Sequence, residues 1–173
     1  MDRAAGVRWQ VLLLVAVLAS GCGQRQPSDD TLTSARAARV QGEVGAFMHA
    51  VARDVTAQGP AAWRQHFSEE PSFFMVADGQ LVFPSGAAVK TAMPELIRSL
   101  PHIELQWGDD IRIDALTPHL AVVAASYREL TVNAAGQKAE SIGFFTGTAE
   151  ERDGRWQFRN AHWSEPLRPR GTP

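Results

Sequence analysis

The sequence predicts one α+β domain in which helices come first and a curved antiparallel sheet comes last. Apolar residues recur every three or four positions between residues 40 and 55, which is the period of an amphipathic helix. After Pro101 they recur at every second position, which is the period of a strand with one buried face. Between these regions, Asp78-Gly79 interrupts an aromatic and β-branched run, and this dipeptide is typical of a tight hairpin turn.

Three helical segments are expected before the sheet. The first is long, and its apolar stripe consists of Val40, Val44, Phe47, Met48, Val51 and Val55. Gly59-Pro60 ends this helix and begins a short second one, because proline suits the first helical turn. Trp63 and Phe67 lie four residues apart on the second helix. A third helix covers residues 89–100, and Pro94 within it predicts either a kink or the true helix start.

Strands occupy most of the remaining domain. Two short strands flank the Asp78-Gly79 turn within residues 71–83. Four longer strands are expected at residues 103–115, 120–133, 141–152 and 155–164. The link through Asp153-Gly154 is short enough to require antiparallel neighbours.

The composition excludes several classes of protein. The 173 residues are 45% hydrophobic and 21% charged, which is ordinary for a globular chain. The formal net charge of -2 argues against a nucleic-acid partner, since such a surface must neutralise many phosphates. The single cysteine, Cys22, excludes an internal disulfide and an all-cysteine metal site. No histidine pair has metal-ligand spacing and no glycine-rich phosphate loop occurs, so neither a metal nor a cofactor is expected.

Residues 1–21 are typical of a signal peptide. An unbroken apolar run at 11–19 follows Arg3 and Arg8, and it is half the length of about 20 residues that a membrane-spanning helix needs. The sequence Ala19-Ser20-Gly21-Cys22 follows and resembles the lipobox of bacterial lipoproteins. The resemblance implies cleavage before the cysteine and attachment of lipid to its thiol. The alternative is an ordinary secreted protein with a spare cysteine.

A lipidated Cys22 predicts a protein of the bacterial cell envelope, anchored in the lipid bilayer by its acyl chains. Residues 22–36 are polar and lack aromatic residues, so we expect a flexible tether. Gly23 stands where the resemblance associates an aspartate with inner-membrane retention. In an organism with two membranes, this favours the periplasmic face of the outer membrane. The folded domain is expected over residues 37–166, and residues 167–173 are expected to be a disordered tail.

The last strand carries the most specific resemblance to a known fold. Asp153-Gly154-Arg155-Trp156-Gln157-Phe158 continues into Ala161-His162-Trp163-Ser164. This pattern is similar to the ending of many members of the nuclear-transport-factor-2-like (NTF2-like) superfamily, which includes SnoaL-like cyclases and ketosteroid isomerase. The resemblance covers residues 40–166 and implies a cone, in which the sheet wraps around the long helix and leaves an open-ended pocket. It implies no activity, because this fold hosts enzymes, binding proteins and assembly modules.

Polar residues on the apolar face of the last strand are the main candidates for a site. Asn160, His162 and Ser164 continue the phase of Trp156 and Phe158, so we expect them either to satisfy backbone groups or to line a wet cavity. His162 titrates near neutral pH and suits acid or base catalysis; the alternative is a histidine fixed by its neighbours. The residues expected to line the pocket are Trp63, Phe67, Tyr127, Phe145, Asn160, His162 and Ser164. The resemblance implies the places of Trp63, Phe67 and Phe145 in this wall, and the alternative for these three is packing in the core.

Asp109 is the second catalytic candidate. It occupies an apolar phase of its strand, where an inward carboxylate would have a raised pKa and would pair with His162. The alternative is a bulge at residues 108–110 that turns Asp109 outward. Tyr127, the only tyrosine, either donates a hydrogen bond to a ligand or packs in the core with its hydroxyl in solvent.

Two functions follow from these expectations. The favoured one is a membrane-tethered binding module outside the cytoplasm, which holds a small apolar or amphipathic ligand or a partner protein without catalysis. The alternative is a small-molecule isomerase, lyase or cyclase that uses general acid/base catalysis at His162. Ketosteroid isomerase chemistry is not expected, because the first helix has no tyrosine for the oxyanion hole. The resemblance also implies a homodimer through the sheet, which would cover Trp163 and Val122.

Overall fold

The computed structural model describes residues 31–166. Its helices are α1 (Ser34–Gln58), the 3-10 helix η1 (Gly59–Ala62), α2 (Trp63–His66) and α3 (Gly86–Ser99). Its strands are β1 (Phe74–Ala77), β2 (Gln80–Phe83), β3 (His102–Trp107), β4 (Arg112–Thr117), β5 (Leu120–Val132), β6 (Lys138–Arg152) and β7 (Arg155–Ser164). The predicted signal peptide, Cys22 and the predicted tail after residue 166 lie outside the described residues.

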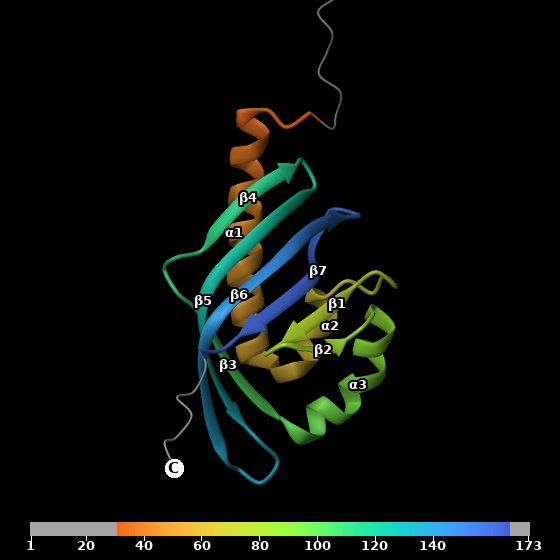
Figure 1. The fold of residues 1–173 in the computed structure, drawn as a ribbon, viewed down its shortest axis with the longest axis vertical. Coiled ribbons are helices and arrows are strands. Elements are labelled where there is room, and N and C mark those ends of the chain that lie inside the picture. The colour runs from red at the N-terminus through yellow and green to blue at the C-terminus, as the bar shows by residue number, and fades with distance from the viewer. Residues whose placement is uncertain (1–30, 167–173) are drawn as a thin grey trace, which may run out of the picture.

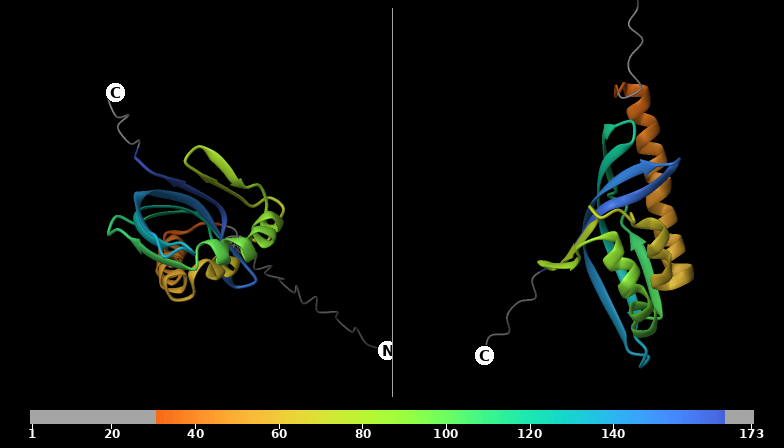
Figure 2. Two further views of the ribbon diagram at one scale, coloured as in Figure 1. Left: turned by 90° about the horizontal axis from the view of Figure 1, so that it is seen from below. Right: turned by 90° about the vertical axis from the view of Figure 1, so that its right-hand side faces the viewer.

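The strands form one curved sheet, and α1 runs along one of its faces (Figures 1 and 2). Their order is β2-β1-β7-β6-β5-β3, and β4 also pairs with β5. The expected α+β cone is therefore confirmed. The expectation of a purely antiparallel sheet is wrong at one pair, because β1 runs parallel to β7. Phe67 already forms a parallel bridge with Phe158, so the chain leaving α2 runs in the direction of β7 and carries β1 with it.

The long helix α1 supplies the centre of the core. All six residues of its predicted apolar stripe are buried. Thr33 caps the helix by accepting a hydrogen bond from the Arg36 amide, so the helix begins before the predicted domain boundary at residue 37. It ends at Gly59, whose φ of 66° favours glycine. The fully buried rings of Phe73, Phe145 and Phe158 complete the core between α1 and the sheet.

The third helix begins earlier than expected. The Ser85 hydroxyl accepts a hydrogen bond from the Ala88 amide, which caps α3 at its start. The helix then continues through Pro94. Pro94 is exposed, so water can bond the carbonyl that lacks its usual amide donor. The proline therefore does not mark the start of the helix.

The strand expected at residues 103–115 is two strands. The turn between β3 and β4 is held against β5, because the Asp110 carboxylate accepts hydrogen bonds from the Ser126 amide (3.0 Å) and hydroxyl (2.7 Å). β3 and β4 therefore pair with different halves of the long strand β5. Asp109 lies in this turn and is exposed.

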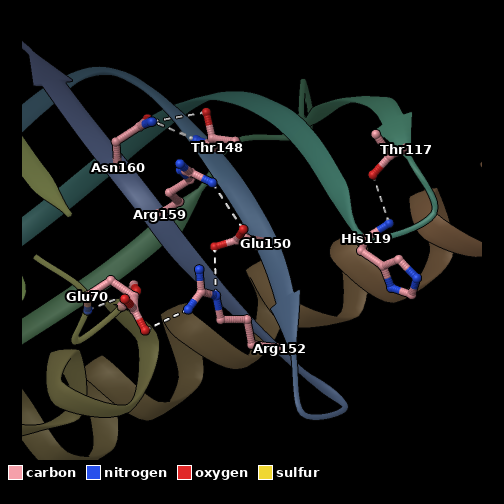
Figure 3. A network of polar contacts seen from close by, with 9 residues as sticks. Glu70, Thr117, His119, Thr148, Glu150, Arg152, Arg159 and Asn160 are labelled. Atoms are coloured by element: carbon pink, nitrogen blue, oxygen red, sulfur yellow. Dashed lines mark hydrogen bonds and ion pairs between the residues drawn. The ribbon is translucent and has the colours of Figure 1, made fainter. Parts of the chain in front are cut away.

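A β-bulge in β7 changes the alternation of the last strand. Phe158 pairs with Ala149 and Asn160 pairs with Thr148, which leaves Arg159 as the extra residue. The Asn160 side-chain oxygen accepts a hydrogen bond from the Thr148 amide at 3.1 Å, and its nitrogen donates to the Thr148 hydroxyl at 3.2 Å (Figure 3). These two bonds satisfy the backbone where the ladder is interrupted.

The bulge reverses which side chains face inward. Before it, Phe158 is buried; after it, Ala161 is buried and the Trp163 ring packs against the core. His162 is exposed on the opposite face. A single inserted residue moves every later side chain of a strand to the other face. The expectation that His162 shares the phase of Phe158 is therefore wrong.

Candidate functional site

A cavity of about 220 Å³ lies between the sheet, α2, α3 and the β1–β2 hairpin. Most of its wall is apolar and is formed by Trp63, Phe67, Met75, Ala77, Phe83, Met93, Leu96, Leu100, Ile103 and Trp163. Its polar lining consists of Asp78, Tyr127, Glu129, Ser141 and Glu165. An apolar cavity with a few converging polar groups is the usual form of a small-molecule site.

The aromatic wall is built around Trp163. Its ring stacks on Trp107 with centroids 5.6 Å apart and meets Tyr127 edge-on at 4.8 Å. It also meets the ring of Trp63 edge-on at 5.8 Å, and Trp63 stacks on Phe67 at 4.8 Å. Offset and edge-on arrangements are the favourable ones for aromatic pairs. The rings therefore hold one another in place and give the cavity a formed wall.

Tyr127 presents a hydroxyl that lacks a protein partner. The residue is only 5% exposed, and among residues 31–166 its hydroxyl makes no hydrogen bond. Burial raises the pKa of Tyr127 to about 12, with the nearby carboxylates of Glu165 and Glu129 acting in the same direction. The phenol therefore keeps its proton and serves as a hydrogen-bond donor. Gly143 leaves room for the ring, since a Cβ there would lie 2.9 Å from the hydroxyl.

Glu129 lies two residues after Tyr127 on the same face of β5. It is half-buried, and within the described part of the chain its carboxyl forms no hydrogen bond or ion pair. Burial raises the pKa of Glu129 to about 7, and the charge of Glu165 adds to this rise. The carboxyl group therefore exchanges its proton near neutral pH. Among residues 31–166, no lysine, arginine or histidine lines the cavity to balance its charge.

Two further carboxylates stand at the rim of the cavity. Asp78 occupies the β1–β2 turn with a φ of 49°, and its carboxylate accepts a hydrogen bond from the Glu165 amide at 3.0 Å. The Asp78 amide donates to the Trp163 carbonyl at 3.1 Å. These bonds tie the turn to the end of β7. They bring Asp78 and Glu165 together in the lining of the same cavity.

The structure brings three of the predicted pocket residues together. Trp63, Phe67 and Tyr127 line the cavity. Phe145 lies beneath this wall, where it is fully buried and packs against Trp163 at 4.7 Å between ring centroids. The Tyr127 ring packs against Trp163 and the residue lines the cavity, so Tyr127 has the packed ring of one expectation and the pocket position of the other.

The other predicted site residues lie outside the cavity. Asn160 bonds Thr148 at the bulge, and the Ser164 hydroxyl donates to the Phe144 carbonyl at 3.1 Å, so both satisfy main-chain groups. His162 and Asp109 are exposed, and neither lines the cavity. Their expected acid/base couple is therefore not formed, because the bulge turns His162 outward and the β3–β4 turn holds Asp109 in solvent.

Sequence reasoning missed Glu129, Glu165 and Asp78 as members of one site. Glu129 carried a visible signal, since it shares the inward phase of Tyr127 on a long strand. Trp163 was also missed and was expected on the outer face of the sheet. Its inward position depends on the bulge.

A buried histidine lies away from the cavity. The Nε2 atom of His66 is 3.2 Å from a carboxylate oxygen of Asp54, but their alignment does not make a hydrogen bond. Burial lowers the pKa of His66, and Asp54 acts in the opposite direction. The neutral imidazole packs against the ring of Phe47 at 5.8 Å between centroids. His66 therefore belongs to the core beside α1.

The described residues contain neither a cluster of metal-binding side chains nor a helix that could cross a membrane. Within residues 31–166, no cluster of three or more His, Cys, Asp or Glu side chains is placed to hold a metal ion. None of the helices in this range is both long enough and apolar enough to cross a membrane.

Comparison with known proteins identifies the fold. No protein-family model and no curated protein matches the sequence. A scytalone dehydratase-like protein from Novosphingobium aromaticivorans superposes with a TM-score of 0.66, 13% identity, and coverage of 78% of this chain and 89% of that chain. An NTF2-like superfamily protein from Salmonella enterica serovar Typhimurium superposes with a TM-score of 0.59 at 13% identity. This match covers 82% of this chain and 99% of that chain. The chain has the NTF2-like fold.

A third structure with this fold is a hexachlorocyclohexane dehydrochlorinase. It superposes with a TM-score of 0.60 at 8% identity, and the match covers 81% of this chain and all of the other. At such identities the likeness concerns the fold alone. Because one NTF2-like fold carries different activities, the function must be argued from the cavity.

Proposed function

We propose that this domain binds a small, largely apolar molecule in the cavity between Trp163, Tyr127 and α3. The observation that carries the proposal is a formed aromatic wall beside two polar groups without protein partners among residues 31–166, the Tyr127 hydroxyl and the Glu129 carboxyl. A ligand that forms hydrogen bonds with both groups would supply the partners that this part of the chain does not.

The binding of a neutral fluorescent probe, N-phenyl-1-naphthylamine, tests this proposal. The variant Leu96→Trp places a larger side chain into the cavity from α3, and Ile97→Trp places the same side chain on the exposed face of that helix. We expect saturable binding to the wild type, at least about tenfold weaker binding to Leu96→Trp, and unchanged binding to Ile97→Trp. Equal affinities for both variants, or no saturable binding to the wild type, would contradict the proposal.

General acid/base catalysis is a second candidate function, and Glu129 rather than His162 favours it. A carboxyl with a pKa of about 7 is suited to take and return a proton at neutral pH, and the adjacent Tyr127 hydroxyl is suited to donate to a ligand oxygen. Two of the proteins with this fold are a dehydratase-like protein and a dehydrochlorinase. Turnover of small β-hydroxy ketones that is lost in Glu129→Gln would support catalysis. Turnover that this variant retains would exclude Glu129 as the base.

We also propose that Cys22 anchors the domain at a membrane of the cell envelope. The support is the apolar run at 11–19 followed by Ala19-Ser20-Gly21-Cys22. The full-length wild type is expected in the membrane fraction, whereas Cys22→Ser is expected in the soluble fraction. Ser28→Ala, in the tether, serves as the control and is expected to fractionate with the wild type. The same distribution for all three chains would contradict the anchor.

A homodimer through the outer face of the sheet stays a prediction. Val122, Ile142 and Phe144 are exposed there, at 39%, 60% and 41% respectively. A second copy that covered these side chains would remove apolar surface from water. Sedimentation at micromolar concentration is expected to give the mass of a dimer, and a strict monomer would contradict it.

A further inference from the structure

The charge of the cavity is one-sided. Glu129, Glu165 and Asp78 line it, and no basic residue of the described range 31–166 does so. Glu165 lies near enough to Glu129 to raise the pKa of that carboxyl. A positive charge placed between Glu129 and Glu165 would relieve this repulsion.

The aromatic wall provides a second observation that points to a ligand. Tyr127 is only 5% exposed, it lines the cavity, and its hydroxyl has no hydrogen-bond partner among residues 31–166. The rings of Tyr127, Trp163 and Trp63 stand beside the carboxylates. The faces of aromatic rings attract cations, and cages that combine such rings bind alkylammonium groups.

We infer that the cavity selects an organic cation, a molecule with an aromatic or aliphatic body and a protonated amine. This inference rests on the proposed binding function and names the class of ligand. The ammonium group lies between Glu129 and Glu165, where its N–H groups donate to the carboxylates. The body packs on Trp163, against Leu96 of α3 and against Leu100, which directly follows that helix.

The same observations disfavour other ligands. An anion would meet three carboxylates and no basic side chain in this cavity. A bare metal ion would lack a set of ligands, because no group of three suitable side chains converges within residues 31–166. A neutral apolar molecule would fill the wall but leave Glu129 without a partner.

Three probes that share one naphthalene body test the charge preference. They are 1-naphthylmethylamine, 1-naphthylmethanol and 1-naphthoate, titrated by calorimetry at pH 8, where Glu129 is ionised. We expect the amine to bind wild-type protein at least about tenfold more tightly than the alcohol, and the naphthoate to bind most weakly. In Glu129→Gln the amine is expected to fall to the affinity of the alcohol. The exposed Glu69 provides the control Glu69→Gln, which is expected to keep the wild-type order.

The outcomes test the preference for a cation separately from the proposed binding function. Equal binding of the amine and the alcohol, or tighter binding of either other probe, overturns the cation preference while the binding function stands. A preference for the amine that survives equally in Glu129→Gln and Glu69→Gln overturns the role of Glu129. If none of the probes binds, and N-phenyl-1-naphthylamine does not bind either, the binding function itself fails. Near-ultraviolet circular dichroism of each variant checks that the aromatic wall is intact.

Discussion

Glu129→Gln is expected to raise the free energy of unfolding at pH 8 by about 1 to 3 kcal/mol. In the folded protein, burial and Glu165 raise the pKa of this carboxyl from 4.5 to about 7. Between these two values the folded chain holds a proton that the unfolded chain releases. The contribution of Glu129 to stability is therefore fully present below about pH 4.5, is lost as the pH rises to about 7, and stays absent above that value.

Glutamine keeps the shape of Glu129 and removes this titration. Urea unfolding of the wild type and of Glu129→Gln at pH 5 and pH 8 measures the effect, with Glu69→Gln as the control. The free energy of unfolding of Glu129→Gln is expected to exceed that of the wild type by a large amount at pH 8 and by a small amount at pH 5. The same small difference at both pH values would show that Glu129 is not held in a low-dielectric cavity. A gain in stability that accompanies weaker ligand binding is typical of residues kept for function.

Phe158→Ala is expected to lower the free energy of unfolding by about 3 to 5 kcal/mol. Phe158 is fully buried, and its ring packs against Phe47 at 4.8 Å and Phe145 at 5.0 Å between centroids. Removing the ring loses its transfer free energy and leaves a void that the neighbouring rings fill only in part. The residue also immediately precedes the bulge that turns Trp163 inward, so the wall of the ligand cavity is expected to loosen as well.

A matched substitution controls for the general loss of a phenyl ring. Phe74 lies on β1 and is 44% exposed, so Phe74→Ala is expected to cost less than about 1.5 kcal/mol. Urea unfolding of both variants at one pH gives the comparison. Similar losses for Phe158→Ala and Phe74→Ala would contradict the packing described for β7 and α1. Weaker binding of N-phenyl-1-naphthylamine to Phe158→Ala alone would link the core to the cavity wall.

Periodicity predicted the long helix and most of the strands. The stripe from Val40 to Val55 has the helical period, and its residues are buried because only one face of α1 meets the sheet. The Asp78-Gly79 turn was predicted from its chemistry, since both residues take positive φ. The break between β3 and β4 was not predictable in this way. It depends on hydrogen bonds from Ser126 to Asp110, which belong to different strands and connections.

The site was predicted only where its residues follow local rules. Trp63 lies on α2, Phe67 directly follows it and Tyr127 lies on β5. The resemblance to the NTF2-like superfamily placed Trp63 and Phe67 in the pocket wall, and the alternation of the strand placed Tyr127 on the face of its apolar neighbours. His162 was predicted on the wrong face because the bulge at Arg159 shifts the alternation of β7. The bulge is stabilised by a hydrogen bond between Asn160 and Thr148, which belong to different strands, so the sequence of β7 alone does not reveal the bulge.

The acidity of the cavity was hidden for a related reason. Glu129, Glu165 and Asp78 come from three separated parts of the chain, and the Asp78 carboxylate meets the Glu165 amide across 87 residues. Their shared environment exists only once the β1–β2 hairpin lies beside β7. The lack of a basic partner is likewise a property of the assembled cavity.

The most direct measurement is a pH titration of the Glu129 side-chain carboxyl carbon by nuclear magnetic resonance, with and without 1-naphthylmethylamine. The charged or titratable groups that face Glu129 in the cavity are Glu165, Asp78 and Tyr127; α3 and β3 contribute only apolar residues to the lining. We predict a midpoint near pH 7 in the free protein and a clearly lower midpoint with the amine bound, because a cation stabilises the carboxylate. A midpoint near 4.5 that the amine does not change would contradict a desolvated, cation-binding Glu129.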